Sequence, residues 1–258
     1  MAPRFNAAKL ARDGYVVLPG LVPRALTAPA VREINHRLGG GDHPGRDRYA
    51  DAHDYLSEYV SSPAVMALAA GAVRELAESL LGAGKVLPVS QAQIALRFPA
   101  AHDAVAYERL VHIDGPYSGM DKMKVLAKRP LRYSLCAGVF LSDQPKPDMG
   151  NFTAYPGTHT RIAREVKRRG LAALKRGVER CIELPAPVQV TGRTGDVVLF
   201  HFQMAHDKAP NFSPHIRRMA YFRFWHEDSW NDVSRAYLTR AMTDIWLEWP
   251  AMRGKHGT

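Results

Sequence analysis

The chain has 258 residues, of which 46% are apolar and 23% are charged. This balance is typical of a globular protein and excludes a disordered, collagen-like or coiled-coil chain. No apolar run reaches 18 residues, and the first residues lack the apolar stretch of a secretory signal, so we expect no membrane partner and a cytoplasmic location. Cys136 and Cys181 are too few for a disulfide framework, and we expect both to be buried thiols.

Lysine and arginine outnumber aspartate and glutamate by 35 to 25, which gives a net charge of +10. Much of this excess lies in residues 161–180, which hold eight basic and two acidic side chains. A nucleic-acid interface would add stacking aromatic residues to such a segment, and it contains none, so we expect no nucleic-acid partner. A solvated helical face is the favoured interpretation, and contact with an anionic substrate remains open.

The first third of the chain has mostly helical patterns. Amphipathic spacing predicts a short helix over 7–12, and the apolar run that follows predicts a strand over 15–18. Apolar residues at helical spacing predict two further helices over 25–38 and 63–81, each followed by glycine. Residues 1–84 are therefore expected to form a mostly helical layer.

After residue 85 the pattern changes to short strands separated by turns. There is no strand–helix alternation, no glycine-rich phosphate loop and no internal repeat. We expect one domain over 1–258: a mainly β fold with helices, with a barrel or jelly roll at 85–226 and a helical segment at 227–258. The predicted strands lie at 86–98, 134–141, 152–155, 188–190, 197–202 and 219–225.

A His-x-Asp motif, formed by His112 and Asp114, ends an apolar run. Residues i and i+2 of an extended chain point to the same face, so this imidazole and carboxylate can bind one metal ion together. A second histidine from a facing strand would complete a two-histidine, one-carboxylate site that leaves three positions open on Fe(II). His206, just past the apolar run at 197–202, is the candidate. Alone, the motif would be interpreted as a structural pair.

Arg217 lies eleven residues after His206, at the start of the last predicted strand. An arginine binds a carboxylate through paired N–H donors. A keto acid that chelates iron at one end needs such a group at its other end, so this order of residues matches an iron- and 2-oxoglutarate-dependent dioxygenase. Arg218 is expected to point to the opposite face of the strand.

The sequence resembles the phytanoyl-CoA dioxygenase family of non-haem Fe(II)/2-oxoglutarate oxygenases over nearly its whole length. This resemblance implies a double-stranded β-helix (jelly-roll, cupin-like) core with an N-terminal helical layer. It implies His112, Asp114 and His206 as iron ligands. It implies Arg217, with Gln93 as a weaker candidate, as groups that bind 2-oxoglutarate, and the cofactors Fe(II), 2-oxoglutarate and O₂. The stretches that carry it are DGYVVLPG at 13–20, QAQIALRFP at 91–99, HIDG at 112–115, GNFTAYPGTH at 150–159 and GDVVLF at 195–200, followed by His206, Asn211 and Arg217.

The sequence departs from the family pattern at two places, and both bear on which substrate it binds. The family's tryptophan after the iron pair falls near Gly138, and the loop 115–133 has no firm counterpart. We expect this loop to contact the substrate, because loops at such rims carry specificity. Its basic side chains predict a small-molecule substrate that bears a carboxylate or a phosphate. They are Lys122, Lys124, Lys128 and Arg129, beside the apolar Tyr117 and Met120.

The expected reaction is hydroxylation of an unactivated C–H bond, in which a natural-product intermediate is one candidate substrate. Because Asp114 is present, the ligand set is complete, although desaturation, epimerisation or ring formation use the same ligands. A non-catalytic metal- or ligand-binding barrel is the main alternative, in which Arg217 would form an internal salt bridge. A nucleic-acid demethylase of the same chemistry is a weaker one.

Other polar residues are given mainly structural interpretations. His201 is expected to be a buried, hydrogen-bonded histidine, with pocket lining as the alternative. His159 is either structural or at the rim of the site. Residues 42–54 are expected to form a solvated loop, or else a lid. Four tryptophans are assigned to packing: Trp225, Trp230, Trp246 and Trp249.

Overall fold

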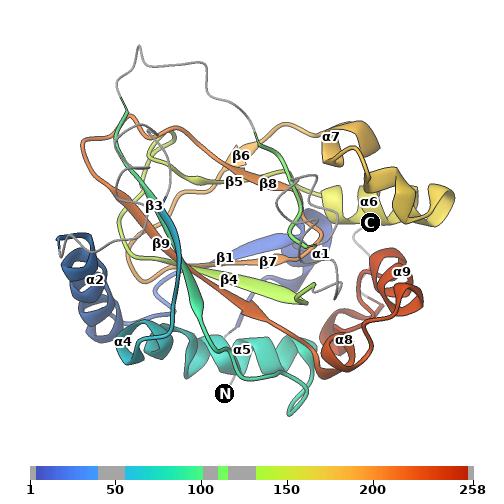
Figure 1. Ribbon diagram of the computed structural model, residues 1–258, viewed down its shortest axis with the longest axis horizontal. Coiled ribbons are helices and arrows are strands. Elements are labelled where there is room, and N and C mark those ends of the chain that lie inside the picture. Colours follow the sequence, from blue (N-terminus) through green and yellow to red (C-terminus); the bar gives the residue numbers. More distant parts are fainter. Residues whose placement is uncertain (1–3, 40–55, 101–109, 116–131, 255–258) are drawn as a thin grey trace.

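The computed structural model (Figure 1) describes residues 4–39, 56–100, 110–115 and 132–254. Within them, two antiparallel sheets have the strand orders β1-β7-β4-β9-β3-β2 and β6-β5-β8. The residues predicted to form a loop or lid at 42–54, and most of the loop 115–133, lie outside the described residues. The strands are β1 (Tyr15–Leu18), β2 (Leu56–Val60), β3 (Ala92–Arg97), β4 (Leu135–Phe140), β5 (Phe152–Ala154), β6 (Val188–Gln189), β7 (Val197–His201), β8 (His206–Lys208) and β9 (Arg217–Phe224).

Each of the predicted strands after residue 85 is present, most of them shorter than predicted. The stretch predicted as one strand over 86–98 is a strand only in β3, because Pro88 lacks the N–H that a ladder needs. Strands β2 and β8 were not predicted, and β1 and β2 bring the N-terminal third into the six-stranded sheet.

Helices α2 (Arg24–Gly39), α4 (Pro63–Met66) and α5 (Ala72–Leu81) lie along one face of the six-stranded sheet (Figure 1). The prediction of one helix over 63–81 was wrong. Gly71 has φ 54° and ψ −126°, a conformation that side chains of L-residues disfavour, and it separates α5 from α4 and the 3-10 helix Ala67–Ala69. The helix predicted at 7–12 is α1 (Ala7–Asp13), which ends at Gly14 in the left-handed conformation.

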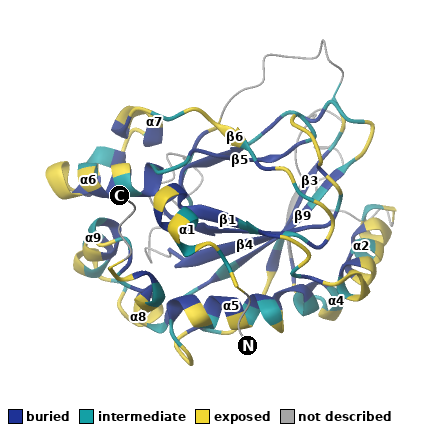
Figure 2. Cartoon of the chain, turned by 180° about the vertical axis from the view of Figure 1, so that it is seen from behind, coloured by how far each residue is buried: buried dark blue, intermediate teal, exposed yellow. Residues whose placement is uncertain are grey.

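The remaining helices lie between β5 and β6 or after β9. They are α6 (Thr158–Arg169), the 3-10 helix Leu171–Leu174, α7 (Val178–Cys181), α8 (Glu227–Asn231), α9 (Arg235–Thr243) and the 3-10 helix Pro250–Met252. Helices α2, α5 and α6 turn exposed residues outward while the central strands are buried (Figure 2). Among the described residues, no helix combines the length and hydropathy that a bilayer crossing needs.

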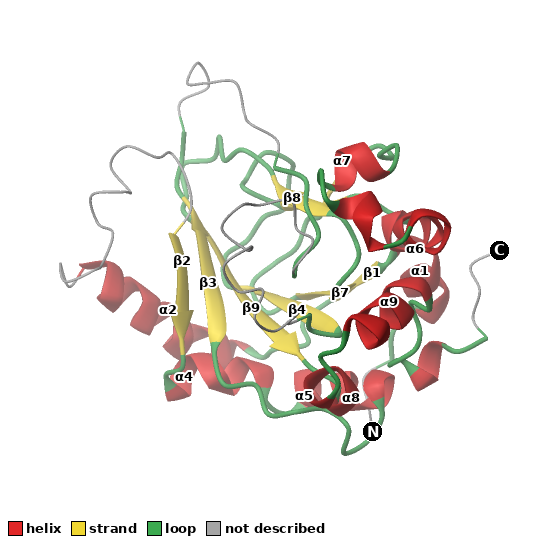
Figure 3. Cartoon of the chain, turned by 45° about the vertical axis from the view of Figure 1, so that its right-hand side comes forward, coloured by secondary structure: helices red, strands yellow, loops and turns green. Residues whose placement is uncertain are grey.

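Alternate residues of the central strands enter two separate cores, as the two-residue period of a strand requires. Ala137 and Phe222 pack with the helices that cover the six-stranded sheet. Cys136 and Tyr221 belong to the second core, which also contains Phe152 of the smaller sheet. The two sheets therefore face each other across this second core, and β8 lies opposite β4 and β9 (Figure 3). The candidate site is built on this side.

Both cysteines are free and buried, as predicted. Trp246 and Trp249 are buried in the first core, and Trp225 packs against the second. Trp230 differs from its predicted packing role, because it is 44% exposed although its ring lies 6.3 Å from that of Trp225.

Two buried histidines, His159 and His201, are neutral and form hydrogen bonds to the backbone of distant elements. His201 donates from Nε2 to the carbonyl oxygen of Ile245, and its Nδ1 accepts from the backbone N–H of Gln203. His159 donates from Nε2 to the carbonyl oxygen of Ala11. Burial lowers the pKa of His159 to about 4 and holds the pKa of His201 well below its usual range. His201 is therefore the buried, hydrogen-bonded histidine that was predicted, and for His159 the structural alternative fits, since it is buried and bonded to the backbone.

We predict that the metal-free protein loses stability as the pH falls from about 7 to 5. The unfolded chain takes up protons near the ordinary histidine pKa of about 6.5, whereas the folded chain does not. Each such histidine then lowers the free energy of unfolding by up to about 1.4 kcal/mol per pH unit. Urea unfolding in EDTA at several pH values measures this slope. His159→Asn should flatten it, whereas the exposed His36→Asn should not; equal slopes in both variants would contradict the prediction.

Candidate metal centre

The structure brings His112, Asp114 and His206 together at the second core. Their potential ligand atoms all lie within 4.8 Å of one another. His112 pairs with His206, the first residue of β8, in an antiparallel bridge: the N–H of His112 lies 3.1 Å from the carbonyl oxygen of His206, and the reverse distance is 2.9 Å. Asp114 follows two residues later, and the three side chains therefore meet at one point.

Hydrogen bonds to the backbone fix the orientation of both imidazoles. Nδ1 of His112 lies 2.7 Å from the carbonyl oxygen of Leu110, and Nδ1 of His206 lies 3.0 Å from that of Met204. Nδ1 is therefore the protonated donor in each ring, and Nε2 keeps its lone pair. The two Nε2 atoms lie 3.7 and 3.9 Å from Oδ1 of Asp114. This donor set of two imidazole nitrogens and one carboxylate oxygen fits Fe(II).

The protonation states of the site also suit a cation. Burial lowers the pKa of His206 to about 4, so this imidazole is neutral at neutral pH. Burial by itself would raise the pKa of Asp114, but Arg223, then the two histidines and the Tyr133 hydroxyl, outweigh it and hold the pKa well below its usual range. A metal ion therefore meets one carboxylate and a neutral imidazole without having to displace protons from either.

Asp114 is held from behind by residues that the sequence did not single out. The Tyr133 hydroxyl donates to Oδ2 of Asp114, and Nη2 of Arg223 lies 3.4 Å from the same oxygen. Nη2 of Arg223 also donates to Oε1 of Gln93 at 2.6 Å. Gln93 thus lies near the site on the inner face of β3, beside Arg223, and its predicted role toward 2-oxoglutarate stays a prediction. Two-residue alternation along β9 from Arg217 was the signal that could have pointed to Arg223.

Arg217 is only 3% exposed and lies on the same face of β9 as Arg223. Its Nε donates to the carbonyl oxygen of Gly150 at 2.6 Å and its Nη1 to that of Ala95 at 3.1 Å. Within the described part of the chain, its Nη2 makes no hydrogen bond. Arg218 is less buried and donates to the carbonyl oxygen of Ile216, consistent with the predicted opposite orientation.

Two further cations that the sequence analysis missed lie close to Arg217. Arg97 is its direct partner in the β3–β9 ladder. Lys208 lies two residues after His206 and therefore on the same face of β8. Burial, followed by the positive charge of Arg97, lowers the pKa of Lys208 to about 8. Three basic side chains thus surround one end of the second core, and an anion such as a carboxylate would stabilise them.

Two glycines make close contacts that a side chain would not allow. At Gly150, which has φ 75°, a Cβ would lie 3.0 Å from Cβ of Arg97 and 3.1 Å from Cβ of Arg217. At Gly138 a Cβ would lie 2.6 Å from Cε1 of Tyr221. The Tyr221 ring therefore occupies the space beside Gly138, near the position expected for the family's tryptophan.

Fold and site together define an antiparallel β-protein with a candidate two-histidine, one-carboxylate metal centre. The chain belongs to the phytanoyl-CoA dioxygenase (PhyH) family, whose family model matches residues 10–219. It is accordingly a 2-oxoglutarate-dependent non-haem iron dioxygenase that uses Fe(II), 2-oxoglutarate and O₂. Family membership does not support the non-catalytic barrel. A search of curated proteins found no match.

Several solved structures share the fold. The α-ketoglutarate-dependent carbocyclase SnoK from nogalamycin biosynthesis has a TM-score of 0.61 at 22% identity, covering 84% of this chain and 82% of that one. The epimerase SnoN from the same biosynthesis has a TM-score of 0.57 at 21% identity, covering 85% and 81%. EctD from S. alaskensis, crystallised with 2-oxoglutarate and 5-hydroxyectoine, has a TM-score of 0.57 at 22% identity, covering 86% and 76%.

Proposed function

We propose that this enzyme hydroxylates an unactivated C–H bond of a small-molecule substrate, with His112, Asp114 and His206 as the ligands of Fe(II). The convergence of their ligand atoms within 4.8 Å carries the proposal. The three donors would bind Fe(II) from one side and would leave its other positions open for a chelating keto acid and O₂. When bound, the iron supplies the oxidising chemistry together with the keto acid and O₂. The protein orients the substrates and excludes water.

Arg217 is proposed to bind the distal carboxylate of 2-oxoglutarate, with Arg97 and Lys208 adding positive charge around it. Supporting this, Lys208 and His206 share one face of β8, so the basic end of the core lies close to the metal ligands. Two hydrogen bonds to carbonyl oxygens hold the Arg217 guanidinium in place before any ligand binds. Such preorganisation lowers the entropic cost of binding.

Aromatic side chains are proposed to keep water away from the metal. The Phe152 ring stacks on His206 at 5.4 Å between centroids, and the Phe200 ring lies 5.2 Å from it. Both phenylalanines are at most 2% exposed. The two rings also restrict the movement of His206, whose imidazole is already fixed by its hydrogen bond to the carbonyl oxygen of Met204.

The finer architecture belongs to the same proposal: the two facing sheets form a double-stranded β-helix within one domain over 1–258, with an N-terminal helical layer. An anionic group on the substrate is supported by the exposed arginines of α6. Among these, Arg168 and Arg169 already pair with Glu165. Lys122 and Lys124 lie outside the described residues.

Hydroxylation is proposed over epimerisation and ring formation because EctD was crystallised with a hydroxylated compound. The carboxylate ligand is common to all three reactions and does not separate them. The SnoN and SnoK folds show that the alternatives need no other architecture. The mass of the product decides among them. Hydroxylation adds one oxygen, ring formation or desaturation removes two hydrogens, and epimerisation changes nothing.

We predict that anaerobic addition of Fe(II) and 2-oxoglutarate gives a visible charge-transfer band from keto-acid chelation. The double variant Asp114→Ala/His206→Ala should abolish the band, because only one of the three ligands remains. Absorption spectroscopy with matched protein concentrations measures it. A band of unchanged intensity in the double variant would place the metal elsewhere.

We predict that Arg217→Ala weakens binding of 2-oxoglutarate and leaves binding of the metal nearly intact. Losing a buried charge-assisted pair should cost about 2–5 kcal/mol, or more than about tenfold in affinity. Arg218→Ala is the matched control and should have a small effect, because that side chain lies on the other face of β9. Calorimetric titration of the metal-loaded protein measures both. The reverse ranking would show that the register of the site is shifted by one residue.

A further inference from the structure

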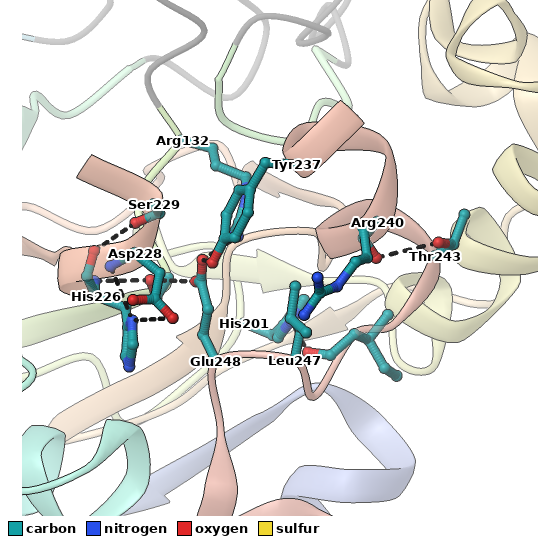
Figure 4. A network of polar contacts seen from close by, with 12 residues as sticks. Arg132, His201, His226, Asp228, Ser229, Tyr237, Arg240, Thr243, Leu247 and Glu248 are labelled. Atoms are coloured by element: carbon teal, nitrogen blue, oxygen red, sulfur yellow. Dashed lines mark hydrogen bonds and ion pairs between the residues drawn. The ribbon is translucent and has the colours of Figure 1, made fainter. Parts of the chain in front are cut away.

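The buried carboxylate of Glu248, in the C-terminal segment, contacts Arg132 and Ser134, which lie just before β4 (Figure 4). Its Oε1 accepts hydrogen bonds from the Arg132 guanidinium and, at 2.7 Å, from the Tyr237 hydroxyl. Its Oε2 accepts from the Ser134 hydroxyl at 2.5 Å. Glu248 is 3% exposed and Arg132 is 4% exposed, so this ion pair is shielded from water.

The three residues that matter most here are consecutive. Arg132 and Ser134 both bind Glu248, and Tyr133 between them donates its hydroxyl hydrogen to Oδ2 of Asp114. Each flanking residue has a second anchor: the Arg132 guanidinium lies 4.5 Å from the centre of the Phe202 ring, and the Ser134 N–H donates to the carbonyl oxygen of Phe224. The backbone of Tyr133 is therefore held on both sides.

We propose that Glu248 is a positioning residue for the carboxylate ligand of the metal. It fixes Tyr133 through Arg132 and Ser134, and Tyr133 then holds Oδ2 of Asp114. With Oδ2 engaged, Asp114 presents only Oδ1 to the histidines. The carboxylate would then occupy one position on a bound metal rather than two, which would keep a position open for O₂ or the cosubstrate.

This inference rests on the proposed function, and it extends the metal centre beyond the part of the chain that the family model matches. That match ends at residue 219. Arg223 and Glu248 both lie after it, and both act on Asp114, one directly and one through Tyr133. The C-terminal segment would thus be part of the scaffold of the iron site and not only a cover for the sheet.

A purely structural role for Glu248 predicts a different result from a positioning role. A structural ion pair, when broken, lowers the stability of the whole fold but leaves the metal centre of the folded molecules unchanged. A positioning residue changes the metal centre in molecules that are still folded. Partners that orient metal ligands in this way typically contribute about 10–100-fold to metal affinity.

The test compares Glu248→Gln and Tyr133→Phe with the control Tyr237→Phe, which removes a hydrogen bond to the same carboxylate but leaves Arg132 and Ser134 bound. Fe(II) affinity and the position of the anaerobic Fe(II)–2-oxoglutarate band are measured well below the unfolding temperature. Glu248→Gln and Tyr133→Phe should each shift the band and weaken Fe(II) binding about tenfold or more. Tyr237→Phe should match the wild type, and combining the first two should add little to either alone.

The proposal is overturned if folded Glu248→Gln keeps the wild-type band and Fe(II) affinity, or if its effect adds fully to that of Tyr133→Phe. If Glu248→Gln does not fold, Ser134→Ala replaces it. This change removes the Oε2 contact, together with the hydrogen bond that Oγ of Ser134 accepts from the His226 N–H, and leaves Arg132 bound to Glu248. An unchanged band there also overturns the proposal. A wild-type protein that gives no band at all would instead refute the proposed function, so the two failures are distinguishable.

Discussion

The pair of backbone hydrogen bonds between His112 and His206 is the constraint on which the rest of the site depends. It joins a short extended segment to β8, so two imidazoles from distant parts of the sequence lie with ring centroids 4.5 Å apart. Asp114 reaches the same point because it follows His112 by two residues in an extended chain. The further backbone acceptors of Nδ1 then orient each ring.

Charge is distributed unequally around this point. The carboxylate of Asp114 faces the two histidines at the candidate metal site and is stabilised from behind by Arg223 and Tyr133. At the other end of the core, Arg217, Arg97 and Lys208 supply positive charge. A metal cation would balance the carboxylate at the first end, and a dicarboxylate would balance the basic side chains at the other. The electrostatics of this core therefore agree with the chemistry assigned to the family.

The sequence was sufficient for features that depend on local spacing. His-x-Asp predicted two side chains on one face, and the alternation at Arg217 and Arg218 predicted which arginine would be buried. It was insufficient where contacts join distant residues: Tyr133 and Arg223 reach Asp114 across 19 and 109 residues, and Ser134 reaches Glu248 across 114. The helix predicted over 63–81 failed for a local reason, because periodicity does not report the backbone conformation of Gly71.

The most direct test of the central claim is the release of succinate by the aerobic protein supplied with Fe(II) and 2-oxoglutarate, measured by NMR during a screen of small-molecule substrates. The account predicts slow succinate release alone and faster release with an authentic substrate, whose product gains one oxygen. Asp114→Ala should release none. Succinate release by wild type that persists undiminished in Asp114→Ala would contradict the claim that His112, Asp114 and His206 form the catalytic iron site.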